Sequence, residues 1–409
     1  MNTLLIIGYV WPEPQSSAAG SHMLSLIRCF KRASWRVIFS TAAKKTEYIT
    51  DLHKEDIETQ EIKVNDSHFD QFITKVNPTA VLFDRFLMEE QFGWRVSECC
   101  PNALRILDTE DLQCLRDARH SALKQNRKFN FSDLNSDLTK REIASIYRCD
   151  ISLIISSFEM SLLTEHFKIA PQLLIHLPFM INLIDRNIIT PNFEQRKNFI
   201  AIGNLRHAPN WDSILYLQKI WPLIRKKLPK AELHIYGAYT PPKATALNNS
   251  KTGFLIKDRA GNVNEVMSQA RVCLAPLRFG AGIKGKLIDA MISNTPNITT
   301  NIGAEGMSTD QQWPGLIEDN LESIVDAAVS LYEDKELWTK NSELCDPLLN
   351  EVYDKERLET KLMNIINHTL KNIEKHRNNN FIGLMLGYHS LKSTKYMSKW
   401  IEEKNKSLY

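Results

Sequence analysis

The sequence alternates short apolar runs with stretches of helical periodicity. Nearly continuous apolar strands separated by helices are typical of a parallel sheet that helices cover on both faces. In the first half of the chain, strands are predicted over 4–10, 36–41, 80–84, 103–108, 150–155 and 172–177, with a weaker one over 61–64. Helices are expected between them, over 17–33, 89–99, 135–148 and 158–167.

The alternation stops at a polar stretch and then restarts, which predicts two domains. Residues 187–198 contain Pro191 and few apolar side chains, so we expect a linker there. Strands are predicted beyond it, over 199–203, 232–237, 253–256, 271–276 and 297–300, with a helix over 210–227. A chain of 409 residues also exceeds the usual size of a single core. We predict an α/β protein with two Rossmann-like, doubly wound domains, 1–186 and 199–353.

The remaining segment, 354–409, reads as charged helices. We expect them to pack back on the N-terminal domain. The lysine-rich amphipathic part, 381–409, leaves a second interpretation open, which is a helix lying on a membrane surface.

Charge and cysteine content exclude several classes of protein. A net charge of +3 gives no general nucleic-acid footprint, so no nucleic-acid partner is expected. The seven cysteines form no CxxC pair, which argues against a disulfide framework or a zinc site and favours a reducing compartment. The apolar run 4–10 is short and is interpreted as a first strand rather than a signal peptide. A cytoplasmic protein without an essential metal is therefore expected.

The stretch 276–306 carries the clearest chemical signal. It follows a predicted strand and contains Gly280, Gly282 and Gly285, then Lys286 at the start of a predicted helix. Glycines between a strand and a helix let backbone N–H groups approach a ligand, and a helix N-terminus favours phosphate. Asp289 lies four residues beyond Gly285, on the same helix face. A carboxylate behind such an open patch suits sugar or ribose hydroxyls, so the stretch predicts a nucleotide-sugar site.

Several motifs in order resemble those of one enzyme family. The run IGNLRHAPNW over 202–211, then ELHIYG, RFGAGIKGKLIDAM and TTNIGAEGM, is similar to the donor domain of family 4 glycosyltransferases (glycosyl transferases group 1), subgroup GAGIKxK. The similarity extends over most of 1–370 and is strongest over 199–307. It implies a GT-B fold, in which the two domains face a cleft. It also implies a retaining, metal-independent, hexosyltransferase-type enzyme with a nucleotide sugar as co-substrate and no other cofactor.

The resemblance and the chemistry of a sugar–diphosphate bond suggest roles for individual residues. Stabilising the departing phosphate requires pre-placed cations, and acidic groups at strand ends could position an acceptor or stabilise a positive sugar. The candidate catalytic residues are Arg206, Lys284, Asp108 and Asp111. The candidate donor-binding residues are Ser17, Gly20, Gly203, Asn204, Asn210, Gly280, Gly282, Ile283, Lys286, Asp289, Gly303 and Glu305.

The sequence also departs from the family pattern. Ala281 stands where many members carry a glutamate, and Asn204 and Asn210 stand where basic residues are common. Two alternatives to a glycosyltransferase stay open on this basis: a non-catalytic nucleotide-sugar-binding protein with a degenerate site, and a GT-B sugar-nucleotide epimerase. The acceptor is not identified by any motif; a surface-polysaccharide or lipid-linked glycan is a family-level expectation, and it would place the protein at the inner face of a membrane.

Overall fold

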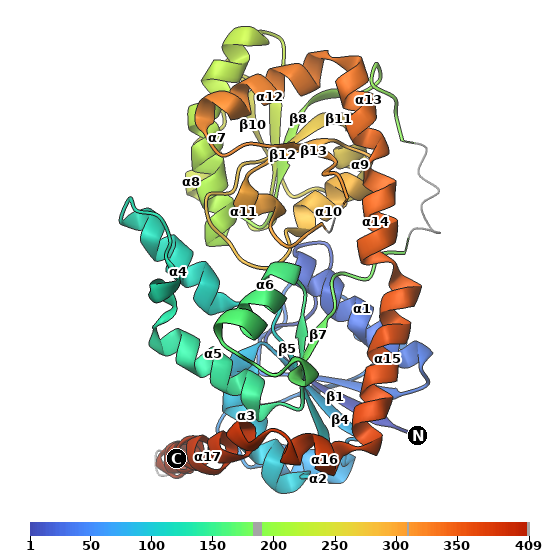
Figure 1. Ribbon diagram of the computed structural model, residues 1–409, viewed down its shortest axis with the longest axis vertical. Coiled ribbons are helices and arrows are strands. Elements are labelled where there is room, and N and C mark those ends of the chain that lie inside the picture. The colour runs from blue at the N-terminus through green and yellow to red at the C-terminus, as the bar shows by residue number, and fades with distance from the viewer. Residues whose placement is uncertain (183–189, 309–310, 407–409) are drawn as a thin grey trace.

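The computed structural model describes residues 1–182, 190–308 and 311–406, which form two lobes stacked one above the other (Figure 1). Within these residues, a seven-stranded sheet has the order β3-β2-β1-β4-β5-β6-β7, and a six-stranded sheet has the order β10-β9-β8-β11-β12-β13. Neighbouring strands in both sheets are parallel. The predicted α/β architecture of two doubly wound domains is confirmed.

The strands of the N-terminal sheet are β1 (Thr3–Gly8), β2 (Arg36–Thr41), β3 (Glu58–Glu61), β4 (Ala80–Asp84), β5 (Leu104–Asp108), β6 (Ile151–Ile154) and β7 (Leu174–His176). Those of the C-terminal sheet are β8 (Lys197–Ile202), β9 (Leu233–Tyr236), β10 (Phe254–Asp258), β11 (Ala270–Ala275), β12 (Asn297–Thr299) and β13 (Gly315–Ile317).

The first lobe also contains α1 (Ala18–Arg32), α2 (His68–Val76), α3 (Phe86–Cys99), α4 (Gln113–Lys124), α5 (Asp137–Arg148) and α6 (Ser157–Ser161). The second contains α7 (Ala208–Lys227), α8 (Pro242–Thr245), α9 (Val263–Gln269), α10 (Gly285–Ile292), α11 (Asn301–Ala304), α12 (Leu321–Glu333), α13 (Lys335–Glu343) and α14 (Cys345–Tyr353). The chain ends with α15 (Lys355–Lys371), α16 (Ile373–Asn378) and α17 (Phe381–Lys406).

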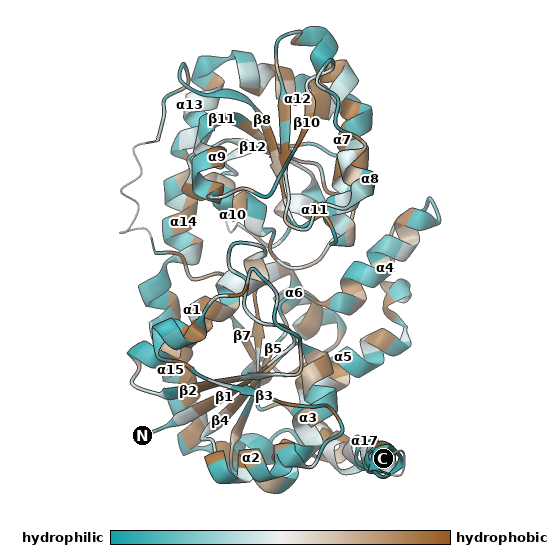
Figure 2. Cartoon of the chain, turned by 180° about the vertical axis from the view of Figure 1, so that it is seen from behind, coloured by the Kyte–Doolittle hydropathy of each residue, from teal (hydrophilic) through white to brown (hydrophobic). Residues whose placement is uncertain are grey.

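Alternate side chains of the central strands face opposite layers. In β1, Leu5 and Ile7 belong to one apolar cluster, whereas Leu4 and Ile6 belong to another on the other face of the sheet. Both sets are fully buried, and Figure 2 shows the apolar strands between helices with polar outer faces. Burying an aliphatic side chain of this size stabilises the fold by roughly 1.5–3 kcal/mol, so this alternation is what holds the sheet between its helices.

The last helices return to the N-terminal lobe. Ile181 and Asp354 form an isolated parallel bridge where the chain crosses back. Beyond it, Leu358, Leu362 and Ile366 of α15 are buried in the same cluster as Leu4 and Ile6 of β1. The start of the predicted linker 187–198 lies outside the described residues, and β8 begins at Lys197.

Some elements differ from the sequence prediction. The weak strand expected over 61–64 lies instead at Glu58–Glu61, a polar edge strand that the apolar pattern could not indicate. The sequence prediction contains no counterpart for several elements, which are the helices α2, α4, α8, α9, α11, α12, α13 and α14 and the short strand β13. For α4 the reason is its composition, since Gln113–Lys124 is mostly polar and presents only a narrow apolar face.

Candidate functional site

A cleft of about 1080 Å³ lies where the carboxyl ends of the two sheets face each other. The loops after β1, β4 and β5 line one side, and those after β8, β9 and β11 line the other. Ligands of open α/β sheets bind beyond the carboxyl ends of the strands, so this cleft is the candidate site.

The glycine-rich stretch forms part of the cleft and leads into α10. Lys284 occupies the N-cap position of α10, and its side chain does not cap the helix. The Lys284 Nζ instead donates to the carbonyl of Gly282 at 2.7 Å. Since the first N–H groups of a helix have no partner within the helix, an uncapped N-terminus leaves donors for an anion.

A second helix begins at the same cleft. His207 is the N-cap residue of α7 and likewise provides no side-chain cap. A chain of side-chain contacts connects the two helix starts: Lys286 Nζ donates to Asn210 Oδ1 at 2.7 Å, and Asn210 Nδ2 donates to the carbonyl of Asn204 at 2.9 Å. The two asparagines that stand at usually basic positions therefore hold Lys286, which carries the charge there.

Three cationic side chains of the C-terminal domain line the cleft. Burial lowers the pKa of Lys286 to about 8 and that of Lys284 to about 8, so both remain largely protonated at neutral pH. Arg206 is exposed, and its guanidinium lies over the Tyr239 ring at 4.2 Å from the centroid. All three residues line the cleft, and Arg206 can form two parallel hydrogen bonds to a phosphate.

Asp289 is the acidic residue on this side of the cleft. Burial raises its pKa to about 7, although the neighbouring Lys286 acts in the opposite direction. A half-buried carboxyl with such a pKa can accept or donate a hydrogen bond at neutral pH, which suits a hydroxyl-bearing ligand.

The N-terminal wall of the cleft is strongly charged. Arg85 and Glu110, which follow β4 and β5, both line it and both have left-handed backbone conformations, with φ of 70° and 60°. Non-glycine residues in this region are strained by about 1–3 kcal/mol and cluster at functional sites. Burial raises the pKa of Glu110 to about 8, and the neighbouring carboxylate of Asp108 adds to the effect.

His22 of α1 lies beside these acids. It is buried, it lines the cleft, and its Nε2 lies 3.7 Å from Asp108 Oδ1. Neither ring nitrogen has a hydrogen-bond partner among the described residues. Burial opposes its protonation, but the surrounding carboxylates, with Asp108 first, raise the pKa of His22.

Most of the residues predicted from the sequence meet at this cleft. Those that line it are Ser17, Gly20, Asp111, Gly203, Asn204, Arg206, Asn210, Gly280, Ile283, Lys284, Lys286 and Asp289. Of these, Ser17 also caps α1 by accepting the N–H of Gly20 at 3.1 Å.

Four predicted residues do not line the cleft, and the first two of them are Asp108 and Gly282. Asp108 is fully buried and accepts the N–H of Glu110 at 3.4 Å, so it supports the wall rather than meeting a ligand. Gly282 faces the N-terminal domain, where a Cβ would lie 2.7 Å from the Cβ of Asp111. A glycine at position 282 permits this close approach of the two domains. The sequence prediction was that Gly282 contacts the donor.

The other two, Gly303 and Glu305, also differ from the prediction of donor contact. A Cβ on Gly303 would lie 1.8 Å from Thr299 Oγ1, so this glycine packs against its own strand. Glu305 forms a two-pronged ion pair with the buried Arg119 of α4, both bonds being 2.7 Å. The Glu305 carboxylate therefore joins the two domains, and it supplies the partner that the buried guanidinium of Arg119 requires.

Sequence reasoning missed His22 and Glu110. Glu110 stands within the acidic run 108–111 that follows β5, and that run was the available signal. His22 had no signal, since a lone histidine in a predicted amphipathic helix more often faces solvent or core.

Residues 196–334 match the family model described as "Glycosyl transferases group 1". These residues form a group 1 glycosyltransferase domain. No curated protein is significantly similar in sequence to the chain. The family predicted from the motifs is thus confirmed for the domain that carries them.

Solved glycosyltransferase structures share the arrangement of both domains. A mutant of TarM from S. aureus, in complex with fondaparinux, alpha-GlcNAc-glycerol and UDP, superposes with a TM-score of 0.70 at 11% identity, over 90% of this chain and 100% of that one. HepE from Anabaena, in complex with UDP and glucose, gives 0.67 at 10% identity over 90% and 100%. WaaG, a glycosyltransferase involved in lipopolysaccharide biosynthesis, gives 0.60 at 13% identity over 89% and 99%. The fold is GT-B, as predicted.

Among the described residues, no helix has both the length and the apolar character needed to cross a membrane. Over the same residues, no group of three or more His, Cys, Asp or Glu side chains is arranged to hold a metal ion.

Proposed function

We propose that this protein is a retaining glycosyltransferase that moves a sugar, of hexosyl type, from a nucleoside diphosphate sugar to an acceptor bound by the N-terminal domain. The observation that carries the proposal is the convergence of two uncapped helix N-termini, those of α7 and α10, with Arg206, Lys284 and Lys286 at one cleft. Donors fixed before the reaction stabilise a departing diphosphate without the need for a metal.

The C-terminal domain would bind the donor. Arg206, Lys284 and Lys286 line the cleft and would bind the diphosphate, and Asp289 lines the same cleft and would bond to ribose or sugar hydroxyls. As the bond to the anomeric carbon breaks, negative charge grows on the diphosphate, so cations that bind it more tightly in the transition state accelerate the step. Removing one such donor costs on the order of 10²–10³ in rate.

The N-terminal wall would receive the acceptor. Glu110 and Asp111 line the cleft opposite the glycine-rich stretch. Burial opposes ionisation of Asp111, but the ion pair with Arg116 lowers its pKa, so its charge is retained facing a positively charged sugar. Two neighbouring acids with pKa values displaced in opposite directions suit one group that stabilises charge and one that exchanges a proton.

For the acceptor, we propose a chemical class and not an individual compound. Of the structures that share the fold, the TarM mutant is in complex with alpha-GlcNAc-glycerol, and WaaG is involved in lipopolysaccharide biosynthesis. A surface-polysaccharide or lipid-linked glycan is therefore proposed as acceptor, at the cytoplasmic face of a membrane. The segment that would touch the membrane is α17.

A donor screen tests the proposal. The purified protein is incubated with UDP- and GDP-sugars, and release of nucleoside diphosphate is measured, with calorimetry for UDP and GDP in parallel. One nucleotide should bind and one donor should be consumed, and the anomeric configuration of the product, read by NMR, should be that of the donor. Conversion of the donor without release of nucleotide would instead identify an epimerase.

One observation keeps a non-catalytic binder as the second candidate. Ala281, at the usual glutamate position, is buried and belongs to the apolar cluster of the N-terminal domain. An apolar side chain there cannot bond to a sugar hydroxyl. Tight binding of UDP or GDP with no sugar released from any donor would favour this candidate over the enzyme.

A further inference from the structure

The last helix, α17, exposes an unusual set of side chains. Of the fifteen large hydrophobic residues that are exposed among the described residues, eight lie on this one helix. They are Phe381, Ile382, Leu384, Met385, Tyr388, Tyr396, Met397 and Trp400, and four of them (Phe381, Tyr388, Tyr396 and Trp400) are 59–73% exposed. Scattered surface hydrophobics are normal, but a concentration of this kind marks an interaction surface.

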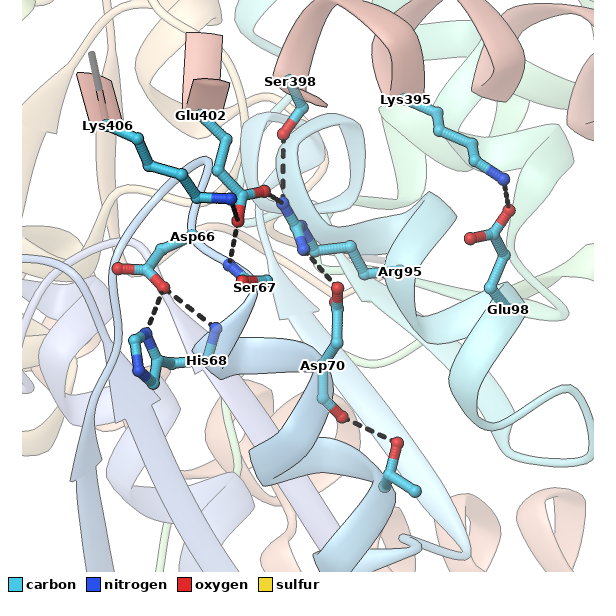
Figure 3. Close-up of polar contacts among 11 residues, drawn as sticks. Asp66, Ser67, His68, Asp70, Arg95, Glu98, Lys395, Ser398, Glu402 and Lys406 are labelled. Carbon is cyan, nitrogen blue, oxygen red and sulfur yellow. Dashed lines mark hydrogen bonds and ion pairs between the residues drawn. The ribbon is translucent and has the colours of Figure 1, made fainter. Parts of the chain in front are cut away.

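Several of the described side chains of α17 make polar contacts with the N-terminal lobe. Figure 3 shows the buried Arg95 of α3 donating to Ser398 Oγ at 3.2 Å and lying 3.7 Å from a carboxylate oxygen of Glu402. Glu402 also accepts the N–H of Ser67 at 3.3 Å, and Lys395 pairs with Glu98 of α3. These contacts fix the rotation of the helix about its own axis.

Small residues complete the inner face. Gly383 is buried, and a Cβ there would lie 2.1 Å from the carbonyl oxygen of Tyr147 in α5. Ser398 is also buried. The described inward contacts of α17 are thus made by a glycine, a serine and charged groups. Packing against this chain does not account for the four aromatic side chains that are 59–73% exposed.

The outward residues follow helical spacing. Phe381, Met385, Tyr388, Lys392 and Tyr396 are three or four positions apart and therefore share one face. Lys392 lies over the Tyr388 ring at 3.8 Å from its centroid, and Lys399 and Trp400 continue the face. Tyrosine and tryptophan among lysines are typical of helices that lie in the interface of a bilayer.

We propose that α17 binds the surface of an anionic lipid bilayer, with its outward aromatic side chains among the headgroups and its lysines against lipid phosphates. The helix crosses the end of the N-terminal lobe that is farther from the C-terminal lobe, so a flat surface can approach it (Figure 1). A second copy of the chain fits this face less well, because a two-fold interface would bring the lysines of the two copies together.

The inference deepens the proposed membrane contact, and its test uses no enzymatic readout, so the result is separate from the transferase activity. The full chain is sedimented with vesicles of phosphatidylcholine alone or with 40% phosphatidylglycerol. We expect at least tenfold stronger binding to the anionic vesicles, and a marked loss as NaCl rises from 0.05 to 0.5 M. Absence of binding to both kinds of vesicle, or equal binding, would overturn the proposal.

Two variants locate the surface. The triple change Tyr388→Ser, Tyr396→Ser and Trp400→Ser, and separately the double change Lys392→Glu and Lys399→Glu, should each reduce partitioning at least tenfold. Matched controls on other surfaces are Phe131→Ser for the apolar change and Lys251→Glu with Lys257→Glu for the charges, and these should bind as the parent does. If the triple variant loses helical circular dichroism signal and is therefore unfolded, the outcome of the test rests on vesicle binding by the Lys392→Glu, Lys399→Glu variant.

Sedimentation velocity tests the alternative that a second copy of the chain, and not a bilayer, covers this face of α17. A monomer whose vesicle binding falls in both variants supports the proposal. A dimer that dissociates in the triple variant, with vesicle binding unchanged, would assign the face to a second copy of the chain.

Discussion

A carboxyl oxygen of Glu159, from the N-terminal domain, accepts the backbone N–H of Gly282, from the C-terminal domain, at 2.9 Å. The same oxygen accepts the N–H of Leu112, at the start of α4, also at 2.9 Å. One buried oxygen thus joins the glycine-rich stretch to the loop that carries Glu110 and Asp111. This carboxyl group therefore helps to fix the relative position of the two cleft walls.

Replacing Glu159 by alanine should therefore weaken both the fold and the site. An unsatisfied buried N–H costs about 1–3 kcal/mol, and two would be left, so we expect about 2–6 kcal/mol less free energy of unfolding. Chemical denaturation measures this loss, and calorimetry should show weaker nucleotide binding. Glu265→Ala, at an exposed position of α9, is the control. Unchanged stability in the Glu159 variant would contradict the assignment.

The same residue predicts a dependence of stability on pH. Burial raises the pKa of Glu159 from 4.5 to about 8, so the folded chain retains a proton that the unfolded chain has lost. The contribution is complete below pH 4.5 and is lost as the pH rises through about 8.

Between pH 6.5 and 8, the free energy of unfolding should fall less steeply in Glu159→Gln than in the parent, by up to about 1.4 kcal/mol per pH unit. Glutamine keeps the shape and an acceptor but does not titrate, so the difference between the two slopes belongs to this carboxyl. Denaturant titrations at four pH values in this window measure it, and parallel slopes would count against a raised pKa.

The parts of the site that the sequence predicted are those fixed by local chain order. A strand, a glycine-rich loop and a helix place Lys286 and Asp289 at the end of β11 wherever the rest of the chain lies. Arg119 and Glu305 show what local order cannot supply: they are 186 positions apart and meet only because the two domains dock. The pair of His22 and Asp108 is another example, since His22 lies on α1 and Asp108 lies at the end of β5.

The fold was predictable for a comparable reason. Buried parallel strands such as β1 and β4 are almost continuously apolar, so composition alone indicates them. Polar edge elements such as β3 carry no such pattern, because one side of them faces water. For α17, the sequence indicates only an amphipathic helix, because it does not tell which side of the helix packs against the protein.

Asp289→Asn should weaken binding of the nucleotide sugar. The amide keeps the size but loses the charge that strengthens a hydrogen bond to a hydroxyl, so we expect roughly tenfold weaker affinity for UDP or GDP, whichever binds. Because burial raises the pKa of Asp289 to about 7, parental affinity should also fall as the pH drops from 8 to 6. Calorimetry at both pH values on parent and variant tests this.

Two results would remove Asp289 from the donor site. One is an unchanged dissociation constant in Asp289→Asn, and the other is a pH dependence identical in variant and parent. Asp117→Asn, at an exposed position of α4, controls for the loss of one negative charge.

Arg206→Ala should reduce turnover by about 10²–10³ while leaving stability nearly unchanged, since the side chain is exposed. Arg206→Lys should recover only part of the loss, because lysine cannot form two parallel bonds to a phosphate. The measurement is nucleoside diphosphate release under saturating donor. Arg127→Ala, which removes another exposed guanidinium, is the control, and near-normal turnover in Arg206→Ala would exclude its role.

The last prediction concerns Glu110, whose carboxyl faces the cleft with a pKa raised by burial to about 8. At neutral pH it is largely protonated, so it can donate a hydrogen bond to a substrate oxygen. The rate should then decline as the pH rises through 8, when that donor is lost. Glu110→Gln keeps a neutral donor of similar shape and should remove the alkaline decline. Glu110→Ala should be about 10²-fold slower at neutral pH and show no alkaline decline, so its deficit should shrink above pH 8.

The pH profile distinguishes this role from a merely structural one. A residue that only supports the loop after β5 would lower the rate of both variants without altering the alkaline limb. Because Glu110 has a strained backbone at φ 60°, Glu110→Gly gives a further comparison. Glycine relieves the strain and removes the carboxyl, so it should gain stability relative to Glu110→Ala yet stay equally slow. A glycine variant that regains the parental rate would show that the backbone, and not the carboxyl, is what the reaction needs.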